Sequence, residues 1–109
     1  MNSDIFDLIK SCFQQESIYY SAHAKREMHT EPLGRITDSE VFEAIMTGEV
    51  IEEYPNDLPY PSLLIFGETI KNRPLHIVCA FDKNEKIVII VTVYEPSPDL
   101  WIEHRRRRT

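Results

Sequence analysis

The sequence predicts an α+β fold in which N-terminal helices pack on a four-stranded antiparallel meander sheet. Helical patterns of apolar residues and helix-cap signals occupy the first half of the chain. Runs of β-branched residues separated by short polar loops occupy the second half. Consecutive strands joined by short loops pair antiparallel, and helices segregated at the front of the chain cover one face of such a sheet.

The stretch 73–94 is the predicted centre of the sheet. Two apolar runs, 74–81 and 87–94, flank the polar loop 82–86, which is the pattern of a β-hairpin. Both runs are apolar at successive positions rather than at alternate ones, as is typical of strands covered on both faces. The few polar residues of this hairpin therefore need a structural or a functional explanation.

The first predicted helix covers residues 4–15, with Ser3 or Asp4 as its N-cap. Its apolar residues recur at the spacing of one helix face, and they are Ile5, Leu8, Ile9, Cys12 and Phe13. Residues 17–20 form either a short β-type segment or the lead-in to a second helix.

Two further helices have clear N-terminal signals. Ser21 is a candidate N-cap for a helix over 22–29. Thr37 and Glu40 fit the capping box, in which a hydroxyl at the N-cap and a glutamate three residues later bond each other's backbone N–H. Gly48 stands where a glycine commonly ends such a helix.

Two more strands precede the hairpin, at 49–54 and 62–67. The acidic residues in the first of them predict an edge strand with one solvated side. The proline-containing segment 55–61 predicts a rigid, extended connection. After the hairpin, residues 100–102 are expected to pack back on the body.

The chain is expected to form a single domain over residues 1–109, with its core at about 4–102. Residues 103–109 are basic, and we expect this tail to be disordered because terminal charge runs are usually solvated. The tail could instead be a phosphate-binding arm, or it could dock on an acidic patch of a partner.

The charge distribution argues against a broad nucleic-acid-binding face. The net charge is −6, but four of the 12 Lys and Arg residues lie in Arg105–Arg108. Eight cations then stand against 18 acidic residues in residues 1–104, which gives that part a net charge of −10. Broad, charge-driven binding of nucleic acid requires a basic surface.

No pattern in the sequence predicts a cofactor or a metal. Cys12 and Cys79 lie far apart in the sequence in apolar surroundings and read as buried free thiols in a reducing compartment. We see no nucleotide-binding loop, secretory signal or apolar run long enough to cross a bilayer. These features predict a cytoplasmic protein that is not associated with a membrane.

One candidate site lies at the open end of the hairpin. If Phe81 pairs with Ile87, then His76, Thr92 and Tyr94 share one face, and Arg73 precedes the same strand. A histidine, a phenol and a guanidinium at one strand end suit acid–base catalysis with stabilisation of an anion. The alternative is structural: His76 is bonded within the sheet and Tyr94 is a packed aromatic residue.

A second cluster lies on the helix predicted over 22–29. His23 and Arg26 are three residues apart and share a helix face, with Glu27 one turn from His23. The histidine and the arginine could hold a phosphate or combine an acid with a charge stabiliser. Alternatively, His23 caps or packs against the sheet while Arg26 pairs with an acidic residue.

The chain resembles the bacterial family known as domain of unknown function 4258. The resemblance covers roughly residues 19–96 and is carried by five motifs, which are His23-Ala-x-x-Arg26-x-Met28, the capped helix Thr37–Gly48, Val50-Ile-Glu-Glu-Tyr54, Arg73-Pro-Leu-His-Ile-Val78 and Val91-Thr-Val-Tyr-Glu-Pro96. It implies a RelE/ParE-like fold and a toxin-type protein of a toxin–antitoxin system. The implied partners are a small antitoxin-like protein and RNA or the ribosome.

The resemblance also implies metal-independent RNA cleavage. His23 or His76 would deprotonate a ribose 2′-hydroxyl, Arg73 or Arg26 would neutralise the phosphate, and Tyr94 or the other histidine would protonate the leaving oxygen. The alternative is a binding module without catalysis that keeps the same fold. Such a module would dock a protein partner through the edge strand at 49–54 or through the arginine tail.

Overall fold

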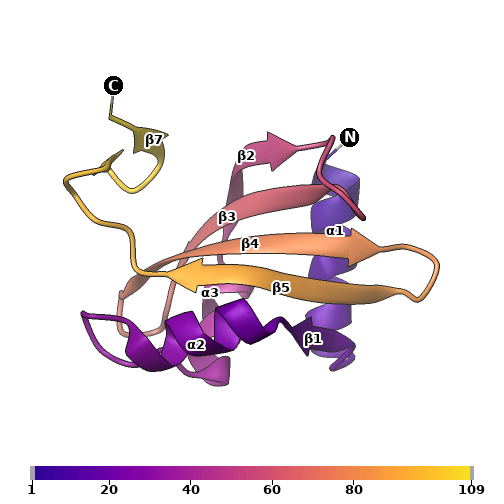
Figure 1. The fold of residues 1–109 in the computed structure, drawn as a ribbon, viewed down its shortest axis with the longest axis horizontal. Coiled ribbons are helices and arrows are strands. Elements are labelled where there is room, and N and C mark those ends of the chain that lie inside the picture. The colour runs from indigo at the N-terminus through magenta and orange to yellow at the C-terminus, as the bar shows by residue number, and fades with distance from the viewer. Residues whose placement is uncertain (1, 109) are drawn as a thin grey trace.

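The computed structural model describes residues 2–108, which form three helices and seven strands (Figure 1). The helices are α1 (Asn2–Gln14), α2 (Ala22–Thr30) and α3 (Asp38–Met46). The strands are β1 (Ile18–Tyr20), β2 (Glu49–Tyr54), β3 (Ser62–Glu68), β4 (Pro74–Asp82), β5 (Ile87–Tyr94), β6 (Trp101–Ile102) and β7 (Arg106–Arg107). The α+β class predicted from the sequence is confirmed.

The main sheet is five-stranded and mixed, in the order β1-β5-β4-β3-β2. Strands β2 to β5 form an antiparallel meander, but β1 adds to β5 in parallel. The predicted four-stranded, purely antiparallel sheet is therefore wrong. A three-residue strand shows no periodicity, and its partner lies about 70 residues later. The N–H of Val88 bonds the carbonyl of Ser17 at 3.1 Å, and the N–H of Ser21 bonds that of Ile90 at 3.0 Å.

The hairpin forms as predicted, but its register differs. Asp82, not Phe81, pairs with Ile87, and a bulge in the ladder shifts the pairing between Val78 and Cys79. The Asp82 side chain accepts hydrogen bonds from two N–H groups of the turn, at 3.0 and 3.1 Å, which explains its place at the strand end. Beyond the bulge His76 pairs directly with Tyr94, so these two side chains do share a face.

The main core lies between the helices and one face of the sheet. The sheet residues in it are Leu63, Ile65, Leu75, Ile77, Cys79, Val88, Ile90 and Val93. Gly67 is required for the closest helix–sheet approach, because a Cβ atom there would lie 1.8 Å from the carbonyl oxygen of Ala44 on α3. Both cysteines are buried and free, as predicted.

Helix α2 covers the part of the β5 edge that β1 leaves open. The Glu27 carboxylate accepts the N–H of Val93, and the Glu31 carboxylate accepts that of Glu95, both at 3.0 Å. Ser21 is the N-cap, accepting the N–H of Ala24 and donating to the carbonyl of Val91. Side chains of α2 thus replace a missing strand partner.

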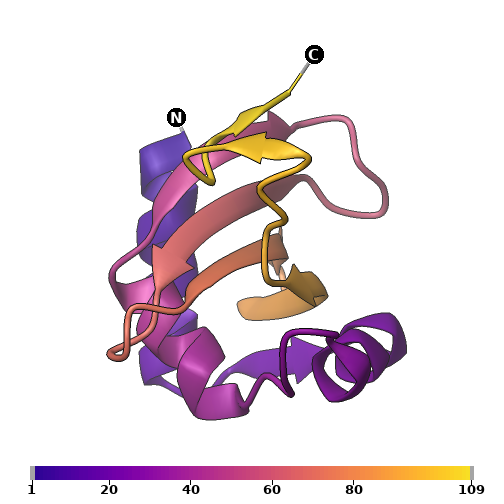
Figure 2. The ribbon, with the colours of Figure 1, turned by 90° about the vertical axis from the view of Figure 1, so that its left-hand side faces the viewer.

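The opposite face of the sheet is covered by the C-terminal segment (Figure 2). Strands β6 and β7 form a small antiparallel hairpin, and Trp101 is only 3% exposed. Arg107 forms a two-pronged ion pair with Glu52 at 2.8 and 3.0 Å, and Arg105 pairs with Glu49. The structure thus differs from the expected disordered tail: Arg105 and Arg107 bind acidic residues of β2, and the indole of Trp101 is buried.

The structure confirms the capping box predicted for α3. Thr37 accepts the N–H of Glu40, whose carboxylate accepts the N–H of Thr37 at 2.9 Å. No helix within residues 2–108 is long and apolar enough to cross a membrane.

Candidate functional site

The structure separates the five predicted site residues into three places. Arg73 precedes β4 and reaches toward α3, on the core side of the sheet, whereas His76 and Tyr94 project from the face under the C-terminal segment. His23 and Arg26 lie on the outer surface of α2. No single cleft joins all five within the described residues.

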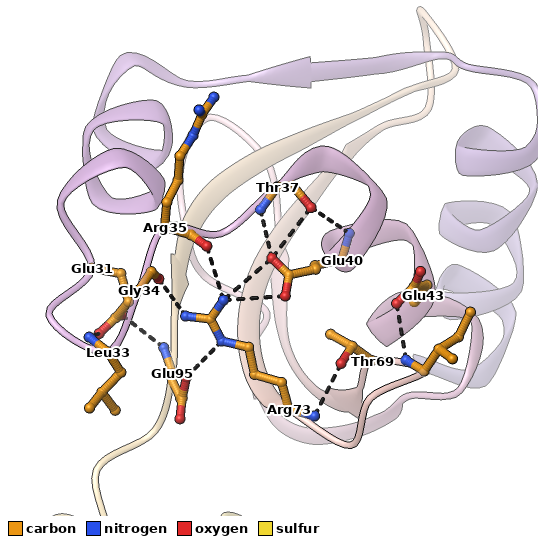
Figure 3. A network of polar contacts seen from close by, with 11 residues as sticks. Glu31, Leu33, Gly34, Arg35, Thr37, Glu40, Glu43, Thr69, Arg73 and Glu95 are labelled. Atoms are coloured by element: carbon orange, nitrogen blue, oxygen red, sulfur yellow. Dashed lines mark hydrogen bonds and ion pairs between the residues drawn. The ribbon is translucent and has the colours of Figure 1, made fainter.

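Arg73 is bound on every side (Figure 3). Its guanidinium forms ion pairs with Glu95 at 2.7 Å and Glu40 at 3.2 Å. It also donates to two backbone carbonyls, those of Gly34 at 2.5 Å and Arg35 at 3.0 Å. Because two carboxylates already neutralise this side chain, Arg73 holds the loop 31–36 and the start of α3 in place rather than standing free for a phosphate.

The pKa of Glu40 reflects this network. Burial alone would raise the pKa of the carboxyl group, but hydrogen bonds from the Thr37 N–H and from Arg73 outweigh that effect and lower it. The pKa of Arg73 is raised correspondingly, since its hydrogen bonds to Glu95 and Glu40 outweigh the effect of burial. Both groups therefore stay charged at neutral pH.

His76 is completely buried in an aromatic cluster. Its ring lies 4.4 Å from that of Trp101 and 5.2 Å from that of Tyr94, both edge to face. Its Nε2 lies 2.5 Å from the carbonyl oxygen of His104, which can only accept, so Nε2 carries the proton. Its Nδ1 then accepts the Tyr94 hydroxyl at 3.1 Å.

Neither member of this pair is suited to proton transfer at neutral pH. Burial lowers the pKa of His76 to about 4, and the hydrogen bond to the His104 carbonyl offsets this only in part. Burial also raises the pKa of Tyr94 to about 12. His76 is therefore neutral and fully bonded beneath the C-terminal segment, which agrees with the structural alternative.

The cluster on α2 is accessible to solvent. Nε2 of His23 lies 3.3 Å from the Glu27 carboxylate, and 57% of the His23 side chain is exposed. Arg26 is exposed, and its side chain makes no hydrogen bond or ion pair within residues 2–108. These two residues are available to a ligand, whereas the three at the hairpin are not.

A pocket that no sequence pattern predicts lies on the other flank of α2. It has a volume of about 490 Å³ and lies between α2, the loop after it and the start of α3. Its lining residues are Tyr20, Lys25, Met28, His29, Arg35, Ile36, Thr37, Asp38 and Ser39. The i, i+4 spacing of Lys25 and His29 is visible in the sequence, but only the folded loop brings Arg35 beside them.

The basic side chains of this pocket have no protein partner. Lys25, His29 and Arg35 make no side-chain hydrogen bond or ion pair in the described part of the chain, whereas Arg73, Arg105 and Arg107 are all paired with carboxylates. Of the other described cations, Arg26 lies on α2 outside the pocket, and Lys71, Lys83, Lys86 and Arg106 lie unpaired on loops and on β7. Lys10 lies over the Phe6 ring, and Arg108 donates to the backbone carbonyl of Pro98.

The surface of α2 and the adjoining pocket offers the cationic groups of Lys and Arg and the imidazoles of His. No group of three or more His, Cys, Asp or Glu residues among those described could hold a metal ion. The fold and this surface define a small α+β protein with a mixed sheet and a solvent-open basic pocket beside α2.

The chain belongs to the family described as Domain of unknown function (DUF4258), whose model matches residues 20–95. This confirms the resemblance found in the sequence. The matched range includes α2, the pocket and the Arg73 network, and it ends before the segment that covers His76. Searches of curated proteins and of solved structures gave no match.

Proposed function

We propose that this protein is a RelE/ParE-like, toxin-type protein of the cytoplasm that cleaves RNA without a metal ion. We also propose that its RNA-binding surface is α2 with the adjoining pocket, not the end of the hairpin. Its partners would be an antitoxin-like small protein and RNA, free or in the ribosome.

The observation that carries this proposal is the concentration of unpaired basic groups in one region, α2 and the loop after it. Lys25, Arg26, His29 and Arg35 lie on α2 and the loop after it, with His23 on the same helix. RNA binding depends on Lys and Arg contacts to phosphates. Since residues 1–104 carry a net charge of −10, the rest of the surface repels a polyanion and favours approach to this one region.

The same surface carries the groups that RNA cleavage requires. An imidazole, His23 or His29, would take the proton from a ribose 2′-hydroxyl as its oxygen attacks the adjacent phosphorus. The bond from phosphorus to the 5′-oxygen of the next nucleotide breaks, and that oxygen receives a proton from a second acid or from water. The products are a 2′,3′-cyclic phosphate and a 5′-hydroxyl, and Arg26, Lys25 or Arg35 would stabilise the charge on the phosphate.

The test is RNA cleavage by the purified protein in the presence of a chelator. We expect His23→Ala or His29→Ala to reduce the rate by about 100-fold or more, as removal of a general acid or base does. Arg26→Gln should also reduce the rate, and Lys71→Gln, an exposed change outside this surface, should not. A rate unaffected by all three α2 variants would refute the site, and cleavage abolished by chelator would refute metal independence.

A second function, a protein-binding module without catalysis, is favoured by a separate observation. Arg73, His76 and Tyr94, three of the five predicted site residues, are fully engaged in structural contacts. Strand β2 lies at the edge of the sheet, where a partner strand can add. A folded protein that neither binds nor cleaves RNA would support this alternative and exclude the ribonuclease.

A further inference from the structure

We propose that the pocket between α2 and α3 binds the phosphomonoester of a ribonucleotide, either free or at the end of an RNA chain. The inference deepens the proposed function, since action on RNA suggests the source of the ligand. The chemistry of the ligand follows from the pocket itself.

Three basic side chains converge on the pocket from two segments. Lys25 and His29 lie one turn apart on α2, and Arg35 comes from the loop that follows it. All three are exposed and unpaired within residues 2–108, so binding a phosphate breaks no existing ion pair. An arginine fork and a lysine charge are a common combination for a phosphate in proteins.

The loop that carries Arg35 is held rigidly, which favours binding because little order is lost. The N–H of Ile36 bonds the carbonyl of Met28 at 2.9 Å, which fastens the loop to α2. On its other side the Arg35 carbonyl accepts a hydrogen bond from Arg73 at 3.0 Å. Figure 3 shows the Arg35 side chain extending away from the Arg73 network. Arg73 thus acts as a positioning residue for the pocket.

The remaining lining residues suit more than a bare phosphate. Met28 and Ile36 are buried and supply apolar contact surface. Tyr20 supplies a phenol whose pKa is raised by burial and by the nearby Asp38 carboxylate, so it keeps its proton and can donate it in a hydrogen bond. A volume of about 490 Å³ is in the range of pockets that hold small organic ligands.

Asp38 gives the pocket a basis for selectivity. Its carboxylate lines the same wall and repels a ligand that is anionic throughout, while it accepts a hydrogen bond from a hydroxyl group. A ribonucleotide has both features, with charge at the phosphate and neutral hydroxyl groups on the ribose. We therefore expect it to bind better than inorganic phosphate alone.

The experiment is a binding titration of the full chain, monitored by calorimetry and by the NMR chemical shifts of the backbone amides of Lys25–Asp38. The probes are 5′-AMP, adenosine and inorganic phosphate, together with one oligoribonucleotide carrying either a 5′-phosphate or a 5′-hydroxyl. We expect 5′-AMP to bind at least tenfold more tightly than adenosine or phosphate. The oligonucleotides show whether the ligand is an RNA end or a free nucleotide. Tighter binding of the 5′-phosphorylated oligonucleotide than of 5′-AMP indicates an RNA end, and tighter binding of 5′-AMP indicates a free nucleotide.

Matched variants test the residues. Lys25→Gln and Arg35→Gln should each weaken 5′-AMP binding about tenfold, whereas the exposed controls Lys71→Gln and Arg106→Gln should not. Equal affinity for 5′-AMP and adenosine, or equal losses in variants and controls, would overturn the inference. RNA cleavage that persists without 5′-AMP binding would refute the phosphomonoester site alone. Specific 5′-AMP binding without any cleavage would refute the proposed ribonuclease and leave the site standing.

Discussion

Replacing Arg73 with methionine is the most informative single perturbation of this fold. Methionine keeps much of the length and apolar stem of arginine but removes the charge and the five N–H donors. The change would leave Glu40 and Glu95 without their shared cation, and the carbonyls of Gly34 and Arg35 without their donor. These groups belong to the start of α3, the loop 31–36 and the end of β5.

The structure sets the expected size of the effect. A hydrogen bond to a charged group contributes roughly 1.5–3 kcal/mol, and removing one partner of a fully buried ion pair costs about 3–5 kcal/mol. The Arg73 side chain is 17% exposed and its two carboxylate partners are 26% and 19% exposed, so water replaces part of what is lost. We therefore expect the free energy of unfolding to fall by about 3 kcal/mol.

Urea denaturation at pH 7 measures this change, with Arg106→Met on β7 as the exposed control. The pH dependence gives a second readout. The pKa of Glu40 is lowered in the folded state, so its contribution to stability is present above the unfolded pKa and is lost as the pH falls through the lower folded value. Without Arg73 that shift is smaller, so the variant should lose less stability than the parent between about pH 5 and pH 3.

A loss of less than about 0.5 kcal/mol at pH 7, the size of an ordinary surface substitution, would refute the structural role of Arg73. The same conclusion would follow if Arg73→Met and Glu40→Gln had strictly additive effects, because residues in direct contact should show a coupling energy. Normal stability with abolished RNA cleavage would instead restore Arg73 to the catalytic group.

Two further predictions concern the face beneath the C-terminal segment. The His76 imidazole should titrate with a pKa of about 4 by NMR. The free energy of unfolding should fall by about 3 kcal/mol from pH 6.5 to pH 4, because over this range the unfolded chain takes up a proton on His76 and the folded chain does not. A titration midpoint above pH 6 would contradict the burial of the ring. Trp101→Ala should lower the free energy of unfolding by about 3 kcal/mol and raise the pKa of His76, since Trp101 packs against its ring. Leu100→Ala, at a side chain that is 66% exposed, is the control, and equal effects of the two changes would show that the segment does not dock as described.

Much of the fold could be predicted because its signals are local. The Thr37–Glu40 capping box, the Ser21 cap and the two apolar strands of the hairpin each depend on residues close together in the sequence. The family membership follows from motifs of the same kind, and the matched range of 20–95 agrees with the predicted 19–96. Local hydrogen bonding and side-chain periodicity specify such elements before any tertiary contact forms.

The surroundings of the candidate site residues could not be predicted from the sequence, because a residue type does not reveal its partners. The chemistry of Arg73 and His76 predicts a catalytic role, but Arg73 is neutralised by Glu40 and Glu95, and His76 is buried under Trp101. Nothing in the segment around Arg35 indicates that Lys25 and His29 are its neighbours in the folded protein. Which charged side chains remain unpaired after folding is revealed only by the tertiary contacts.

The sequence by itself determined the α+β class, the order of the helices and hairpin strands, and the family. The tertiary structure alone decided that β1 joins β5 in parallel, that a bulge sets the register opposite His76, and that the arginine tail docks on β2. The physical reason is the separation in sequence between the groups that interact. Helix caps and turns are specified within a few residues, whereas strand addition, ion-pair choice and burial depend on groups about 20 to 70 residues apart that meet only in the folded chain.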